Sequence, residues 1–270
     1  MEAEILRYYD LGREADRLQI PFFAWERFRT FDLLDRFLPP APAVILDVGG
    51  AAGAYAFPLA EKGYLVDLID PVPLHLQQAK QRARETGRGP RTLQVGDARS
   101  IAAADGTADA VLFFGPLYHL TDRNERLTAI REARRVLKVG GTLLAVAISR
   151  FASALDGISR GLIRDAEFLR IVEKDLETGQ HRNETAKPDY FTTAFFHQPD
   201  EFKAELTDGG FPTVTLCGIE GPLWNVTLPD IPAERERLMT AIRAIESEPA
   251  LLGASAHIMA IANKPDSVLW

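Results

Sequence analysis

The sequence has very little cysteine and no long apolar run, and each of these absences removes a class of protein. The single cysteine in 270 residues, Cys217, cannot form an internal disulfide or a cysteine-cluster metal site. Cys217 lies in an apolar run, so we expect it in the core. No run of about 18 apolar residues is present to span a bilayer, and the N-terminus lacks the basic-then-apolar layout of a signal peptide. We therefore expect a cytoplasmic protein that does not bind a membrane.

An excess of positive charge is also absent. The chain has 31 basic and 38 acidic residues, which gives a net charge of −7. Affinity for nucleic acid comes largely from Lys and Arg that contact phosphates, so we expect no nucleic-acid partner. Hydrophobic residues make up 46% and charged residues 26%, values that are ordinary for a globular protein. The length fits one elaborated α/β domain, and we predict a single domain over residues 1–270.

Strand and helix patterns alternate from residue 43 to residue 150. This alternation is typical of right-handed βαβ units in a doubly wound parallel sheet. For the helix near 123–138, Asp122 and Glu125 are spaced as a capping box at its start, and Gly140 is expected to stop it. The pattern predicts strands near 44–48, 65–69, 92–95, 109–114 and 142–148, and helices near 54–62, 73–86 and 123–138.

The flanking segments are predicted to complete the fold. Residues 1–40 read as a helical lid of two helices separated near Pro21, before a core for ligand binding at 41–150. Residues 151–198 read as a cap insertion over the carboxyl ends of the strands, where open α/β sheets bind ligands. Residues 199–270 then finish the sheet. They are predicted to contain helices near 199–208 and 232–247, and strands near 213–218 and 255–262, the last of which is apolar on both faces and so internal to the sheet.

A turn of small residues follows the first strand. The strand at 44–48 runs into Gly-Gly-Ala-Ala-Gly at 49–53, which lets backbone N–H groups approach a nucleotide-like ligand. The turn alone also fits a relaxed dinucleotide fingerprint. Asp47 argues against a dinucleotide, because a carboxylate there repels a pyrophosphate but attracts a cationic sulfonium or ammonium group. Asp70 ends the second strand, where a carboxylate can accept from ribose hydroxyls in either type of site.

Taken in order, the motifs resemble those of the class I S-adenosylmethionine-dependent methyltransferases, in particular the bacterial small-molecule branch similar to ubiquinone/menaquinone-type methyltransferases. The family usually has Gly where this chain has Ala51. The resemblance implies an α/β fold with a Rossmann-like, seven-stranded, mostly parallel sheet, helices on both faces and a helical cap over the active site. It also implies that the last strand is antiparallel and lies between the fifth and the sixth. The residues that carry it are 46–53, Asp70, Gly96-Asp97, 109–111 and 136–141.

On this resemblance the cofactor is S-adenosylmethionine. Its ligands are expected at the turn and at the ends of the second, third and fourth strands, with Asp97 placed to accept from the adenine amino group. The predicted cofactor-binding residues are Asp47, Gly49, Gly50, Ala51, Gly53, Asp70, Pro71, Asp97, Ala98 and Phe114.

The methyl acceptor is predicted to be a small molecule. Methyl transfer by in-line displacement requires alignment and, for a hydroxyl acceptor, removal of a proton. Tyr118 and His119, after the fourth strand, are the catalytic candidates, with His119 either a base or a structural group of the loop. O-, N- and C-methylation all stay open. No cluster of His and acidic residues stands at metal-ligand spacing, so no metal is predicted. The predicted substrate-binding residues are Tyr8, Tyr9, Arg29, Arg150, His181 and Tyr190, whereas His75 and His257 are expected to be structural.

Two other functions stay open at this point. One is a non-catalytic protein of the same fold that binds S-adenosylmethionine or a partner, which a cavity plugged by Tyr118 and Phe191 would favour. The other is a nucleotide-sugar or nicotinamide enzyme with a relaxed turn. The aromatic-rich N-terminal helices also offer a contact surface for a homodimer.

Overall fold

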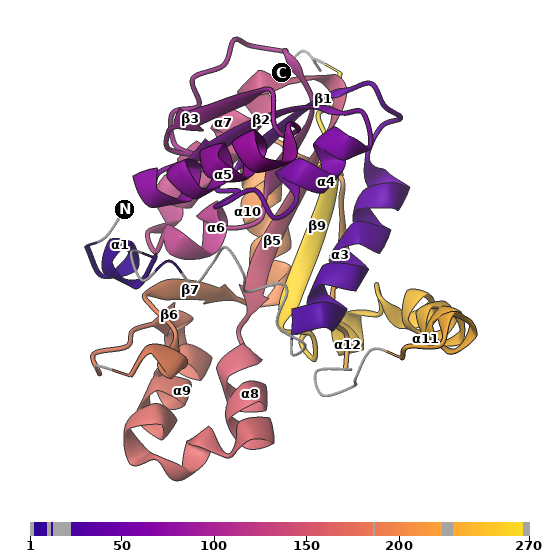
Figure 1. The fold of residues 1–270 in the computed structure, drawn as a ribbon. Helices are drawn as coiled ribbons and strands as arrows, with labels where there is room; N and C mark the ends of the chain where they lie inside the picture. The colour runs from indigo at the N-terminus through magenta and orange to yellow at the C-terminus, as the bar shows by residue number, and fades with distance from the viewer. Residues whose placement is uncertain (1–2, 10–11, 13–22, 186, 223–228, 267–270) are drawn as a thin grey trace.

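A nine-stranded sheet forms the centre of the molecule (Figure 1). The computed structural model describes residues 3–9, 12, 23–185, 187–222 and 229–266. The path through the sheet is β3-β2-β1-β4-β5-β7-β6, and β9 pairs with both β5 and β8. The first five strands are β1 Val44–Val48, β2 Leu65–Asp70, β3 Thr92–Val95, β4 Ala108–Phe113 and β5 Leu137–Ser149.

These five strands pair in parallel, as the sequence predicts. The strand β5 begins earlier than expected, directly after helix α7 (Arg123–Val136). Gly140 has a φ of 75° and lies inside β5, where the register to β4 shifts, so the prediction that it stops the helix was wrong. Gly140 instead lies in a bulge of the strand, because a residue without a side chain adopts a left-handed backbone conformation at little cost in free energy.

The late strands complete the sheet as the resemblance implies. The strand β9 (His257–Asn263) runs antiparallel to both β5 and β8 (Val214–Gly218) and therefore lies between them. Its residues from Ile258 to Ala262 are all buried, which explains why the segment is apolar on both faces.

Two short strands in the insertion, β6 (Gln180–His181) and β7 (Ala194–His197), were not predicted, and they raise the count from seven to nine. The strand β7 pairs with Ile148 and Ser149 at the end of β5. Because β9 occupies the other edge of β5, β7 lies on the edge that β4 uses, beyond the point where β4 ends. The insertion is thus attached to the sheet by backbone pairing.

Helices cover both faces of the sheet (Figure 1). The side chains of α7 and α10 form one apolar core with the strands, and those of α3, α4 and α5 form a second core on the opposite face, which includes the buried Cys217. Asp122 caps α7 by accepting from two backbone N–H groups, whereas the Glu125 side chain contacts Arg99 and does not complete a capping box. The remaining bounds are α3 Ala24–Phe37, α4 Ala56–Glu61, α5 Pro73–Thr86, α10 Pro199–Asp208, α11 Pro232–Ile245 and α12 Pro249–Leu252.

The insertion and the N-terminal helix lie beyond the carboxyl ends of the strands. Helices α8 (Ala152–Arg160) and α9 (Ala166–Thr178) project below β5 in Figure 1. Helix α1 (Ala3–Tyr9) is tied to the segment before β7, because the Thr193 hydroxyl donates to Glu4 Oε2 at 2.6 Å. The predicted boundary at Pro21 lies outside the described residues. Among the described helices, none is both long and apolar enough to cross a membrane.

Candidate active site

The turn after β1 is held by hydrogen bonds to the end of β2. Gly49 N donates to Ile69 O at 2.7 Å, and Ala51 N donates to Asp70 Oδ2 at 2.8 Å. Gly49 has a φ of 74°, and a Cβ there would lie 2.8 Å from Cδ of Pro116. Glycine is therefore required at position 49 both by conformation and by space. Ala51 has a φ of 48°, a strained value for a residue with a side chain.

Asp70 connects this turn to helix α5. Its Oδ1 accepts from Val72 N at 2.9 Å and lies 3.0 Å from His75 Nδ1. His75 donates from Nδ1 to this carboxylate, so its Nε2 is left as an acceptor. Nε2 is buried and has no hydrogen-bond partner among the described residues. A buried acceptor without a partner marks a place where a ligand can donate a hydrogen bond.

Asp47 is fully buried behind the turn. Neither of its carboxylate oxygens has a hydrogen-bond partner in the described part of the chain. A Cβ on Gly50 would lie 2.4 Å from Asp47 Oδ2, so the turn closes directly over this carboxylate. Burial, together with the negative charge of Asp70, raises the pKa of Asp47 to about 7.

The first cavity lies at the ends of β1 to β4. All of the predicted cofactor-binding residues line it except Asp47 and Gly53. Asp97 is paired with Arg99, whose guanidinium holds the pKa of that carboxyl below its ordinary value. The sequence reasoning missed several lining residues, namely Val48, Ala54, Tyr55, Val72, His75, Gly96, Arg99, Gly115, Pro116 and Leu120.

His119 lies at the end of α6 (Pro116–His119), between the N-terminal helix and the cap. Tyr9 Oη is 2.6 Å from His119 Nε2, and His119 Nδ1 is 3.4 Å from Thr193 O. Because a carbonyl only accepts, we assign the ring proton to Nδ1, so that Nε2 accepts from Tyr9. Burial lowers the pKa of His119 to about 4, and the ring is therefore neutral at pH 7.

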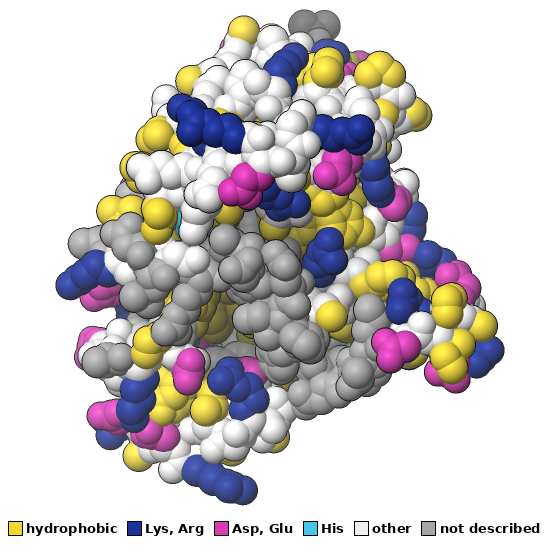
Figure 2. Space-filling model, in the orientation of Figure 1, with side chains coloured by type: hydrophobic (Ala, Val, Ile, Leu, Met, Phe, Trp, Pro, Cys, Tyr) yellow, Lys and Arg dark blue, Asp and Glu magenta, His cyan; other side chains and the backbone are white. Residues whose placement is uncertain are grey.

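A second cavity of about 480 Å³ opens next to the first. Figure 2 shows hydrophobic side chains inside a hollow on this face of the molecule, with acidic and basic side chains intermixed around it. Tyr9 and Tyr118 line both cavities. The aromatic side chains that line the second cavity are Tyr8, Tyr9, Phe23, Trp25, Tyr118, Phe168, Tyr190, Phe191 and Phe196.

Four of the six predicted substrate residues line the second cavity: Tyr8, Tyr9, His181 and Tyr190. The ring nitrogens of His181 are both engaged, with Nδ1 2.8 Å from Asp175 Oδ2 and Nε2 2.8 Å from Tyr190 O. His181 therefore has both ring nitrogens engaged within the protein, and its ring stacks on Phe196 with the ring centroids 4.7 Å apart.

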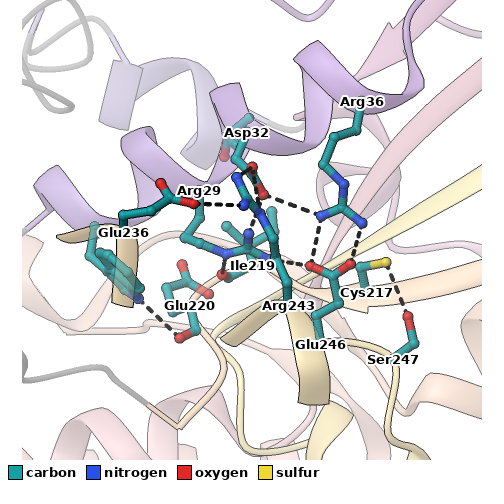
Figure 3. A network of polar contacts seen from close by, with 12 residues as sticks. Arg29, Asp32, Arg36, Cys217, Ile219, Glu220, Glu236, Arg243, Glu246 and Ser247 are labelled. Atoms are coloured by element: carbon teal, nitrogen blue, oxygen red, sulfur yellow. Dashed lines mark hydrogen bonds and ion pairs between the residues drawn. The ribbon is translucent and has the colours of Figure 1, made fainter. Parts of the chain in front are cut away.

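The other two predicted substrate residues, Arg29 and Arg150, line neither cavity, which corrects that interpretation. Arg29 is fully buried and donates to Ile219 O at 3.1 Å (Figure 3). Arg150 is 3% exposed and donates from Nε to Phe196 O at 2.8 Å. A buried guanidinium needs such partners, and both side chains find them in the protein framework.

The fold also brings together three residues that are far apart in the sequence. Glu26, Glu220 and His257 each place one potential ligand atom within 4.8 Å of the others, and all three line the second cavity. The sequence reasoning expected His257 to be structural and found no local spacing of this kind. The three residues come from α3, the segment after β8 and the start of β9, so only tertiary structure could reveal the group.

Comparisons with known sequences show similarity to methyltransferases. The family described as "Methyltransferase domain" matches residues 45–141. A ubiquinone/menaquinone biosynthesis C-methyltransferase UbiE from Caulobacter sp. (strain K31) is 27% identical over 199 residues, which cover 69% of this chain and 74% of that protein. A ubiquinone biosynthesis O-methyltransferase from Methylobacterium sp. (strain 4-46) is 30% identical over 127 residues, 44% of this chain and 48% of that protein.

Solved structures share the fold. A crystal structure of a SAM-dependent methyltransferase from Methanosarcina mazei aligns with a TM-score of 0.59 and 22% identity, over 86% of this chain and 97% of that chain. A putative S-adenosyl-L-methionine-dependent methyltransferase from Methanococcus maripaludis aligns with a TM-score of 0.60 and 17% identity, over 100% of this chain and 99% of that chain.

Proposed function

Because the chain is a class I S-adenosylmethionine-dependent methyltransferase that resembles the ubiquinone-type enzymes, we propose that it methylates a small molecule held in the second cavity. The observation that carries this proposal is that Tyr9 and Tyr118 line both cavities, so that the two cavities meet at these rings. A donor in one cavity and an acceptor in the other would be brought into contact there, as an in-line displacement requires.

The residues around the first cavity fit S-adenosylmethionine, which supplies a methyl group on a positively charged sulfur. We assign the ribose hydroxyls to Asp70 and to the unpartnered Nε2 of His75, since both can accept hydrogen bonds. Asp97 is assigned to the adenine amino group. With a pKa of about 7, the buried Asp47 is partly ionised at neutral pH, and its negative form behind the turn favours a cationic ligand without direct contact.

Tyr9 and His119 are proposed to act on the acceptor as a pair. A base with a pKa of about 4 holds a proton poorly at pH 7, so His119 is a weak general base by itself. Its Nε2 instead orients the Tyr9 hydroxyl, whose oxygen is 2.6 Å away, and Tyr9 lines both cavities. In this assignment His119 is a positioning residue and Tyr9 contacts the acceptor.

The lid and the cap are proposed to exclude water from the junction. Helix α1 supplies Tyr9, while the insertion supplies Phe168, Tyr190 and Phe191 to the same cavity. The cavity has a volume of about 480 Å³ even though Tyr118 and Phe191 line it, so these rings do not plug it. That room favours a bound acceptor over the non-catalytic alternative.

Two measurements test the proposal. Calorimetry with S-adenosylmethionine and S-adenosylhomocysteine should give saturable binding, and a screen with labelled methyl donor against a metabolite panel should give a labelled small molecule. No binding by the intact protein at millimolar ligand would contradict the cofactor assignment. Binding without labelling of any small molecule, but with labelling of protein or nucleic acid, would contradict the acceptor assignment.

A further inference from the structure

Glu26, Glu220 and His257, here called the Glu26 cluster, form a polar group within the second cavity. Their potential ligand atoms lie within 4.8 Å of one another. Glu26 is 7% and Glu220 is 6% exposed, so both carboxylates are largely removed from bulk water. None of the three lines the first cavity. The group therefore belongs to the acceptor side alone.

Glu220 is held in place by its neighbours. Its Oε1 lies 2.6 Å from His257 Nδ1, and its Oε2 accepts from Ser255 Oγ and from His257 N, both at 2.9 Å. The Trp25 indole donates to Glu220 O at 3.1 Å. Since Trp25 precedes Glu26 on α3, this bond also fixes the position of Glu26 beside Glu220. The two carboxylates are thus preorganised before any ligand binds.

A buried ionic network supports the same arrangement from behind (Figure 3). Arg29, one turn after Glu26 on α3, donates to Ile219 O at 3.1 Å and to Glu246 Oε2 at 2.7 Å. Arg36 donates to the same Glu246 carboxylate from the next turns of α3. The bond from Arg29 to Ile219 O ties α3 to the segment that carries Glu220, and the bonds to Glu246 hold the same helix against the residue that follows α11.

The other side chains of the second cavity also suit a cation, which is the kind of ligand that carboxylates attract. Nine aromatic side chains of the described residues line the cavity, and the faces of aromatic rings attract cations. Among the described lining residues the only Lys or Arg is Arg160, which pairs with Asp156 in the same cavity. Ser153 also lines the cavity, and its buried hydroxyl has no hydrogen-bond partner among the described residues, which leaves it able to bond to a polar ligand.

We propose that the Glu26 cluster anchors a protonated amine of the methyl acceptor. This inference rests on the proposed function of the second cavity and names the class of its substrate. Because the cluster lines only the second cavity, the ammonium group is an anchor, and a different atom of the acceptor lies at the junction with the first cavity. Glu26 and Glu220 determine specificity, and Ser153 supplies a further polar contact.

The test compares two probes of the same shape, phenethylamine and 2-phenylethanol, by calorimetry on the full chain saturated with S-adenosylhomocysteine. The amine should bind at least about tenfold more tightly, as expected for a desolvated cation between carboxylates and aromatic rings. Glu26→Gln should remove this preference and leave the affinity for the alcohol unchanged. Asp189→Asn is the matched control, since it removes a negative charge from an exposed residue of the same cavity and should keep the preference.

Equal affinity of the wild-type protein for the two probes would overturn the inference, and this measurement needs no variant. An equal loss of the preference in the Asp189→Asn control would also overturn it, because the effect would then be one of general charge. A titration with Mn²⁺ or Zn²⁺ is the second arm: stoichiometric binding that Glu26→Gln abolishes, with no preference for the amine, would assign the cluster to a metal ion instead. Saturation with S-adenosylhomocysteine is recorded first, so its failure separates a wrong cofactor assignment from a wrong amine assignment.

Discussion

The two cavities are built in different ways. The first lies at the ends of the four parallel strands β1 to β4, where the small-residue turn after β1 meets side chains from α1, α5 and α6. The second is made from side chains of segments that lie far apart in the sequence, from α1 to β9. Tyr9 and Tyr118 are shared between them.

The residues proposed to bind the methyl donor and those proposed to bind the acceptor therefore come largely from different parts of the chain. The turn after β1 tolerates little change, because neighbouring backbone and side-chain atoms fix its shape. A cavity made from side chains on several elements can change its ligand when single residues change. Variants in the first cavity should therefore affect S-adenosylhomocysteine binding or the framework, and variants in the second should affect the acceptor.

The largest expected effect comes from Asp47→Asn. In the folded protein the pKa of Asp47 is raised from 3.8 to about 7, so the wild type loses stability as pH rises through this window, whereas the neutral variant does not. The difference at pH 8 is on the order of 4 kcal/mol in favour of the variant, at about 1.4 kcal/mol per pKa unit. Thermal unfolding at pH 4.5 and pH 8 measures it.

Asp109→Asn is the control for that experiment. Hydrogen bonds from Lys138 and from Val44 N, which outweigh a partial burial, hold the pKa of the Asp109 carboxyl below its ordinary value. This variant should therefore be less stable than the wild type at pH 8, the opposite sign. If both variants shift in the same direction, burial of Asp47 is not the cause.

The next effect is expected from Gly49→Ala. The added Cβ would lie 2.8 Å from Pro116 Cδ at a φ of 74°, and we expect a loss of about 3 kcal/mol in stability or in S-adenosylhomocysteine affinity. Gly87→Ala is a matched control, because Gly87 has a similar φ of 67° but a Cβ added there would meet nothing within 4 Å. It should cost about 1 kcal/mol and leave affinity unchanged. Equal losses would show that conformation alone matters at the turn.

Tyr9→Phe should separate catalysis from cofactor binding. Removal of the hydroxyl that bonds to His119 Nε2 should lower kcat about tenfold or more, with little change in S-adenosylhomocysteine affinity. His119→Gln should give a similar split between kcat and affinity, since it disturbs the same pair. Tyr8→Phe, on the same helix and in the second cavity only, should change kcat less. An equal loss of turnover and cofactor affinity would make the pair structural.

The smallest effect is expected from Ala51→Gly. At a φ of 48° the alanine is strained, so glycine should stabilise the protein by about 0.5 to 1 kcal/mol. A rise in Tm with unchanged acceptor binding would show that a change in the turn affects stability and leaves the second cavity unaffected. A fall in Tm would mean that the methyl group of Ala51 contributes packing that outweighs the strain.

Much of the fold could be predicted from the sequence, because strand burial and helix periodicity are local signals. The last strand is apolar on both faces, which correctly predicts its place inside the sheet. The strands β6 and β7 escape prediction, since two and four residues give too short a pattern. The role of Gly140 is wrongly predicted because a glycine after a helix and a glycine in a strand bulge look alike in sequence.

The site residues also differ in how well the sequence predicts them, since local motifs are readable and contacts between distant segments are not. Eight of the ten cofactor-binding residues predicted from ordered motifs line the first cavity, whereas Asp47 lies behind the turn and not along it. The sequence favours a structural role for His75, although this residue follows Asp70 by five positions, lines the first cavity and keeps a buried Nε2 without a partner among the described residues. Arg29 is wrongly predicted in the pocket wall because a sequence cannot show that Glu246, 217 residues away, binds it.

The rings of Tyr9 and Tyr118 have a consequence for inhibitor design, because they border both cavities. A single ligand that joins an adenosine part to an amine-bearing part would pass between these two rings. The adenosine half would give affinity but little selectivity, since the turn proposed to bind it lies within residues 45–141, which match the methyltransferase family. Selectivity for this enzyme would come from the half that reaches Glu26.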